Sequence, residues 1–193
     1  MNKFIGSVLA IFSVMVFIGC NDQGRVIQGR VIAYNQGTVT FIEDSSLVQG
    51  QPEYKTLPPV VFTIPEDKNE MGAEPSPGLR LALDVDAQKV TVFDRGTGQF
   101  REIPYTVVDR KRNVGRNDPL VKGIAFPVIN REAKTVQIYS KRQKVLETFT
   151  LAPEYADLPD ETWIAGDEVR IYYREAGKAV RLMNVTKTDI FKK

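Results

Sequence analysis

Residues 79–108 read LRLALDVDAQKVTVFDRGTGQFREIPYTVV, and this stretch decides the fold class. Apolar and polar side chains alternate in it with a period of two residues, which is the repeat of a β-strand with one buried face. Residues 94–98 interrupt the alternation with amino acids that are common in turns. We therefore predict strands near 79–85, 88–93 and 99–108, joined by tight turns.

The same period-two pattern fills most of the chain after residue 24. Further strands are predicted near 25–34, 37–43, 58–64, 124–129, 134–140, 144–151, 168–174 and 178–186. Two acidic stretches that contain proline, 65–71 and 153–161, are predicted to form short helical turns. The predicted fold class is all-β, a small β-barrel or sandwich, because closed or packed sheets cover the edges of strands.

The predicted strands form two sets that resemble each other in order. The similar segments are 38–41 (TVTF) with 135–138 (TVQI), 62–64 (FTI) with 149–151 (FTL), and 79–83 (LRLAL) with 169–173 (VRIYY). One interpretation is a tandem duplication of a five-stranded module of the size of an SH3 or OB domain. A first module would cover residues 25–109 and a second 124–193, with the polar, basic segment 110–123 as connector. The other interpretation is chance agreement between alternating sequences.

The N-terminal residues 1–20, MNKFIGSVLAIFSVMVFIGC, have the composition of an export signal. Lys3 precedes an apolar run from Phe4 to Ile18, which is 15 residues long (4 to 18). A transmembrane helix needs about 20 such residues. A positive head, a short apolar run and a small residue at the exit are typical of a secretory signal peptide, here residues 1–19.

The end of this segment, Phe17-Ile18-Gly19-Cys20, resembles the lipobox of bacterial lipoproteins, although Phe17 stands where leucine is usual. The resemblance implies cleavage between Gly19 and Cys20, a diacylglyceryl group on the Cys20 sulfur, and a lipidated tether at residues 20–24. The membrane would then be a partner, bound through acyl chains. If the cell has two membranes, Asn21 favours the outer membrane, facing the periplasm, over the inner membrane. The alternatives are an ordinary signal peptide with a chance cysteine and an uncleaved short anchor.

The composition of the chain excludes several kinds of chemistry. There is no histidine, and Cys20 is the only cysteine. Histidine-based triads, thiol catalysis and the commonest metal sites are therefore excluded, and we expect no cofactor and no metal. Without residues 1–19 the chain has 25 basic and 24 acidic side chains, since Lys3 is the only charge removed from 26 and 24. This balance gives no reason to expect a nucleic-acid partner.

The densest local charge consists of Arg110, Lys111, Arg112 and Arg116. Basic residues near an anionic membrane surface contribute about 1 kcal/mol each, so this cluster is a candidate contact for lipid headgroups. The alternative is a solvated loop neutralised by nearby aspartates.

Three other groups of residues are candidates for a site. Asp84 and Asp86 have a spacing that calcium accepts, but a tight turn explains both. The acidic stretches provide candidates for a glycosidase-like carboxylate pair, namely Glu66, Asp67 and Glu70 with Asp157, Asp160 and Glu161. Trp163, Tyr172 and Tyr173 are a candidate aromatic binding patch. Because Tyr172 and Tyr173 are adjacent in a strand, they are expected on opposite faces.

Taken together, these features favour a non-catalytic lipoprotein of the cell envelope that binds or scaffolds an envelope protein or ligand. Its domain is similar to that of uncharacterised lipoproteins, and this likeness transfers no site residues. A carboxylate-dependent hydrolase of envelope glycans and an accessory subunit of an envelope complex are the alternatives. Facing carboxylates in a cleft would favour the hydrolase. An exposed apolar patch would favour the subunit.

Overall fold

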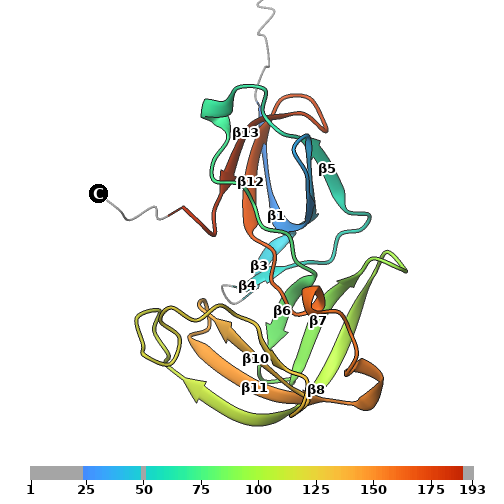
Figure 1. The fold of residues 1–193 in the computed structure, drawn as a ribbon. Coiled ribbons are helices and arrows are strands. Elements are labelled where there is room, and N and C mark those ends of the chain that lie inside the picture. The colour runs from blue at the N-terminus through green and yellow to red at the C-terminus, as the bar shows by residue number, and fades with distance from the viewer. Residues whose placement is uncertain (1–23, 49–50, 189–193) are drawn as a thin grey trace, which may run out of the picture.

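The computed structural model describes residues 24–48 and 51–188, and in them the predicted all-β fold class is confirmed. Figure 1 shows two antiparallel sheets, one above the other, with a short hairpin between them. Neither sheet is a closed barrel. No helix in the described part is long and apolar enough to cross a membrane.

The first sheet has five strands, drawn from both ends of the chain. Their order is β13 (Ala179–Asn184), β12 (Glu168–Tyr173), β1 (Arg25–Tyr34), β2 (Thr38–Glu43) and β5 (Val60–Thr63). Alternate residues of these strands point to one face and form its core, which includes Val31, Phe41, Phe62, Ile171 and Leu182. The predicted period-two pattern therefore supplies this core directly.

The second sheet has six strands from the middle of the chain. Their order is β6 (Arg80–Asp84), β7 (Lys89–Asp94), β8 (Gln99–Arg112), β11 (Val145–Leu151), β10 (Thr135–Ser140) and β9 (Val128–Asn130). Its core includes Val90, Ile103, Ile138, Phe149 and Trp163. The stretch 79–108 thus forms a three-stranded meander at one edge of the sheet.

The remaining elements are short. Strands β3 (Ser46–Val48) and β4 (Gln51–Glu53) form a small hairpin between the predicted strands 37–43 and 58–64, where we predicted no strand. Single 3-10 turns form at η1 (Lys68–Glu70), η2 (Pro153–Tyr155) and η3 (Asp160–Thr162). The helical turns predicted near 65–71 and 153–161 are therefore present.

The sheets do not divide the chain at the predicted connector, residues 110–123. The hairpin β6–β7, which we assigned to the first module, lies in the six-stranded sheet. The hairpin β12–β13, assigned to the second module, completes the five-stranded sheet. The tight turn at residues 94–98 keeps β7 beside β8, and the free edge of β1 pairs with β12. The order of strands thus differs from a tandem arrangement.

The two sheets pack against each other through a shared apolar cluster. Ile32 and Ile42 from the first sheet contact Leu81 and Phe93 from the second, with Tyr54 and Leu79 between them. The two chain segments that connect the sheets run side by side. The amide of Arg80 donates to the carbonyl of Ile164 at 3.0 Å, and that of Asp167 donates to Ser76 at 2.8 Å. The junction is therefore held by backbone hydrogen bonds as well as by apolar contacts.

Candidate ligand cleft between the two sheets

A cleft of about 1250 Å³ lies at the junction and is lined by residues of both sheets. Its basic lining residues are Arg30, Arg80, Arg116, Lys141, Arg142 and Lys187, and its acidic ones are Asp84, Asp86 and Glu168. Its apolar lining includes Leu81, Val121, Ile124 and Phe126. With six basic and three acidic side chains, the cleft is suited to a ligand with negative charge.

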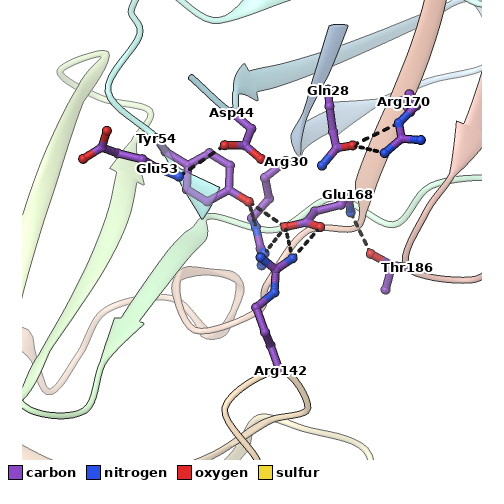
Figure 2. A network of polar contacts seen from close by, with 9 residues as sticks. All are labelled: Gln28, Arg30, Asp44, Glu53, Tyr54, Arg142, Glu168, Arg170 and Thr186. Carbon is purple, nitrogen blue, oxygen red and sulfur yellow. Dashed lines mark hydrogen bonds and ion pairs between the residues drawn. The ribbon is translucent and has the colours of Figure 1, made fainter. Parts of the chain in front are cut away.

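Glu168, the first residue of β12, is the centre of a buried polar network in the cleft (Figure 2). Its carboxylate accepts hydrogen bonds from Arg30 Nη2 at 3.0 Å, from Arg142 Nη2 at 2.9 Å and from the Tyr54 hydroxyl at 2.9 Å. Its amide donates to Thr186 Oγ1 at 2.7 Å. Because these partners come from different elements, one carboxylate ties together β1, the segment after β4, and the β10–β11 turn.

The environment fixes the protonation states of this network. Burial raises the pKa of Tyr54 well above its usual value, a shift that the charge of Arg30 opposes and that of Glu168 supports. Burial lowers the pKa of Arg30, but the neighbouring Tyr54 and Glu168 outweigh burial and leave it above its ordinary value. Tyr54 therefore remains a hydrogen-bond donor and Arg30 remains charged at neutral pH. The Arg30 guanidinium also lies 5.3 Å from the centre of the Tyr54 ring.

Arg80, the first residue of β6, lies in the same cleft without such a partner. Its Nε donates to the carbonyl of Trp163 at 2.9 Å. Among residues 24–48 and 51–188, no carboxylate lies within ion-pair distance of its guanidinium. Burial, and after it the charge of Arg30, lowers the pKa of Arg80 to about 9. At neutral pH the cleft thus holds a half-buried, uncompensated positive charge.

One rim of the cleft is fixed by a second polar network. The buried Asp167 accepts hydrogen bonds from the amide of Ser76 at 2.8 Å and from Asn184 Nδ2 at 2.9 Å. Lys187 Nζ lies 3.1 Å from the same carboxylate oxygen. Three donors thus hold one oxygen of the Asp167 carboxylate, next to the cleft-lining residues Gly166 and Glu168.

The described part of the chain contains no group of three or more His, Cys, Asp or Glu side chains arranged to hold a metal ion. Asp84 Oδ1 accepts hydrogen bonds from the amides of Asp86 at 3.1 Å and Ala87 at 2.8 Å. Asp86 in turn pairs with Arg112 at 3.2 Å. The tight turn that we weighed against a calcium site is therefore what these two aspartates form.

The predicted basic cluster is divided between different environments. Arg110 makes a two-pronged ion pair with the fully buried Glu147, with both N–O distances at 2.7 Å. Lys111 pairs with Asp109 at 2.8 Å, and Arg112 pairs with Asp86. Of the four predicted residues, Arg116 is the one that lines the cleft. These four side chains thus do not form one anionic contact surface.

A β-bulge explains why Arg110 turns inward. Opposite β11, Val107 pairs with Phe149 and Asp109 with Thr148, so Val108 is an extra residue. Tyr105 and Arg110 are five apart and would lie on opposite faces of a regular strand. The bulge shifts this alternation and places both beside Glu147. Burial, followed by the charge of Glu147, raises the pKa of Tyr105 above its usual value.

The predicted aromatic patch does not form. Trp163 is only 1 % exposed and packs against Phe149 in the core of the six-stranded sheet. Tyr173 packs edge-on against Phe62, 5.0 Å between ring centres, in the core of the other sheet. Tyr172 lies next to Gly24 rather than in that core, so the two tyrosines face opposite ways. Trp163 and Tyr173 belong to different cores.

The acidic stretches also remain separate from the cleft. Glu70 pairs with Arg181, Asp160 with Arg131, and Glu161 with Arg95. Asp67 caps η1 through the amide of Asn69, and none of the six predicted carboxylates lines the large cleft. A smaller pocket of about 180 Å³ is lined by Glu161 and Asp94, and both of these are ion-paired with arginines.

Sequence reasoning missed the residues that give the cleft its character, namely Arg30, Arg80, Arg142 and Glu168. In the sequence, each stands at a polar position of the alternating pattern or in a turn, where a charged side chain is ordinary. The only sequence signal for these residues was an arginine inside an apolar run, Leu79-Arg80-Leu81, which concerns Arg80 alone. The predicted lipidation and cleavage residues, Cys20 and Gly19, lie outside the described residues.

Comparison with known proteins adds one relationship to this geometry. Neither a curated protein nor a solved structure matches the chain. The family model described as "Domain of unknown function (DUF4881)" matches residues 22–193, and the chain therefore belongs to this family.

Proposed function

We propose that this protein is a non-catalytic lipoprotein of the bacterial cell envelope that binds a ligand in the cleft between its two sheets. The observation that carries the proposal is the cleft itself, about 1250 Å³ in volume with a mixed apolar and basic lining. Ligand sites in proteins are typically concave, partly apolar and equipped with a few oriented polar groups.

The anchor part of the proposal is supported by the sequence of the N-terminus. Cys20 closes a short apolar signal and is the only cysteine in the chain. Two or more acyl chains on this residue would hold the protein stably at a membrane, since each buried methylene contributes about 0.8 kcal/mol. Asn21 favours the outer membrane as the site of attachment.

The anchor is tested by mass spectrometry of the N-terminus and by cell fractionation. We expect a mature chain that begins with an acylated Cys20, and a Cys20→Ala variant that is lost from the membrane fraction. A Cys20-containing chain that begins elsewhere, or an unmodified thiol, would contradict this part of the proposal.

The cleft is tested by ligand-induced thermal stabilisation of the full chain in a neutral detergent, because a ligand raises the melting temperature by mass action. Charged and neutral envelope metabolites form the panel. Ile124 is 46 % exposed inside the cleft and Val108 is 58 % exposed outside it. We expect Ile124→Trp to abolish the stabilisation by obstructing the cleft and Val108→Trp to leave it unchanged. Stabilisation that survives Ile124→Trp would place the ligand elsewhere.

A further inference from the structure

The guanidinium of Arg80 is prepared for a ligand that the protein itself does not supply. Every buried side-chain nitrogen and oxygen of the described residues has a hydrogen-bond partner. The side-chain hydrogen bond of Arg80 uses Nε alone, which leaves its two Nη nitrogens open to the cleft. The Nε of Arg80 donates to the Trp163 carbonyl, and its backbone amide donates to the Ile164 carbonyl. The direction of the side chain is therefore set before any ligand binds.

The charges around Arg80 are not balanced. Arg30 and Arg142 both contact Glu168 Oε1, at 3.0 Å and 3.1 Å, so two guanidinium groups share one carboxylate. Together with Arg80, three guanidinium groups line the cleft around the carboxylate of Glu168. A half-buried charge without a partner costs stability, and proteins retain such groups where they serve a site.

Phosphate is the anion that fits this arrangement best. Arginine presents its N–H groups in a planar fork that binds phosphate or carboxylate oxygens through two parallel hydrogen bonds. A phosphomonoester has close to two negative charges at neutral pH and three acceptor oxygens. A phosphate can therefore accept from both Nη nitrogens of Arg80 and still present an oxygen to a second guanidinium, whereas a carboxylate has only two oxygens.

We propose that the Arg80 end of the cleft binds the phosphate group of a phosphomonoester, with Arg80 as the principal contact and Arg30 and Arg142 as flanking charges. This inference rests on the proposed function of the cleft and names its ligand class. The phosphate can belong to a soluble metabolite or to a lipid headgroup, and both present the same chemistry to Arg80.

The test measures binding of inorganic phosphate to the full chain in a neutral detergent, by calorimetry and by NMR of the Arg80 Nε–H resonance. We expect saturable binding that shifts this resonance. Arg80→Gln should weaken binding roughly tenfold or more, since a hydrogen bond to a charged group contributes about 1.5–3 kcal/mol. Arg80→Lys keeps the positive charge but loses the planar fork of N–H groups, and should bind phosphate with intermediate affinity.

Arg170→Gln is the matched control, because Arg170 is exposed, bonds to Gln28 and does not line the cleft. It changes the net charge by the same amount and should bind phosphate like the wild type. Glycerol 3-phosphate and short-chain phosphatidic acid then compare a soluble with a lipid phosphomonoester, and tighter binding of either identifies the source.

Two results with phosphate as the ligand would overturn the inference. One is the absence of saturable phosphate binding and of a shift in the Arg80 resonance of the wild type, a measurement that does not depend on how a variant folds. The other is equal weakening by Arg80→Gln and Arg170→Gln. Tighter binding of succinate than of phosphate would likewise reject the phosphate class. In each case the proposed function of the cleft would still stand if another ligand stabilised the wild type and Ile124→Trp abolished that stabilisation.

Discussion

Arg142 Nη2 lies 2.9 Å from Glu168 Oε2, and this contact joins the β10–β11 turn of the six-stranded sheet to the first strand residue after the crossover into the five-stranded sheet. The Glu168 side chain is only 8 % exposed, so the pair lies in a weakly screened environment. The ion pair therefore contributes to how firmly the two sheets are held around the cleft.

Replacing Glu168 with glutamine should lower the free energy of unfolding by about 3 kcal/mol, because Arg30 and Arg142 would lose their shared counter-charge in a buried place. Urea denaturation with a common m-value measures the difference. Glu175→Gln is the control, since Glu175 pairs with Lys178 on the surface and should change stability by less than about 0.5 kcal/mol. Similar small effects of both variants would show that the network does not hold the junction.

Most of the local structure of the protein follows from its sequence, because the alternation of apolar and polar residues that predicts a strand involves only residues close in sequence. Strand β1 matches the predicted residues 25–34, and the turn at residues 94–98 lies where its turn-forming residues predict. The pairing of distant strands could not be predicted in this way. Arg25 lies opposite Tyr173 across 148 positions of sequence, and alternation does not specify which edge accepts which strand.

The pair Arg110–Glu147 should be strongly coupled, because Glu147 is fully buried and both of its carboxylate oxygens accept from one guanidinium. Arg110→Met alone leaves an uncompensated carboxylate, and we expect a loss of about 3–5 kcal/mol in the free energy of unfolding. The double variant Arg110→Met with Glu147→Leu should recover much of that loss. A double-mutant cycle measures the coupling, and strictly additive effects would contradict it.

The raised pKa of Tyr54 predicts that the free energy of unfolding falls at alkaline pH. The folded pKa of Tyr54 lies well above the usual value of 10.0 expected for the unfolded chain. Since the folded pKa is raised, the contribution of Tyr54 to stability is fully present below about pH 10 and is lost as the pH rises toward the folded pKa. Tyr54→Phe removes the hydrogen bonds to Arg30 and Glu168 and should cost about 1–2 kcal/mol at pH 7.

The corresponding measurement is urea denaturation of both proteins between pH 7 and about pH 11, a range that spans the unfolded pKa. The difference between wild type and Tyr54→Phe should be constant up to about pH 10 and then shrink. A difference that stays constant through this range would mean that the hydroxyl titrates near its ordinary pKa. Tyr155→Phe serves as control, because Tyr155 lies outside the Glu168 network, in the turn η2.

The candidate site was harder to predict than the local structure because its residues come from segments that are distant in the sequence. Arg30 and Arg142 are 112 positions apart, and their shared carboxylate, Glu168, comes from a third segment. Nothing in the local sequence of any of them differs from an ordinary surface charge. Conversely, Trp163 suggested a binding surface, but its large apolar area is buried in a core, which is the commoner place for it.

The backbone at the junction of the sheets is closely packed around Gly166. A Cβ atom added at Gly166 would lie 1.8 Å from the carbonyl oxygen of Val31. That oxygen accepts a hydrogen bond from the amide of Gly78 at 3.1 Å, so it cannot move away without breaking the contact between the connecting segments. Gly166→Ala should therefore lower the free energy of unfolding by about 3 kcal/mol through overpacking. Because Gly166 also lines the cleft, any cleft ligand should bind this variant less tightly.

At Gly115, where an added Cβ meets nothing within 4 Å, the same substitution should change stability by no more than about 0.5 kcal/mol. Equal melting temperatures for Gly166→Ala and Gly115→Ala would show that the junction has room to relax, and that the close approach of its three segments is not what fixes the two sheets around the cleft.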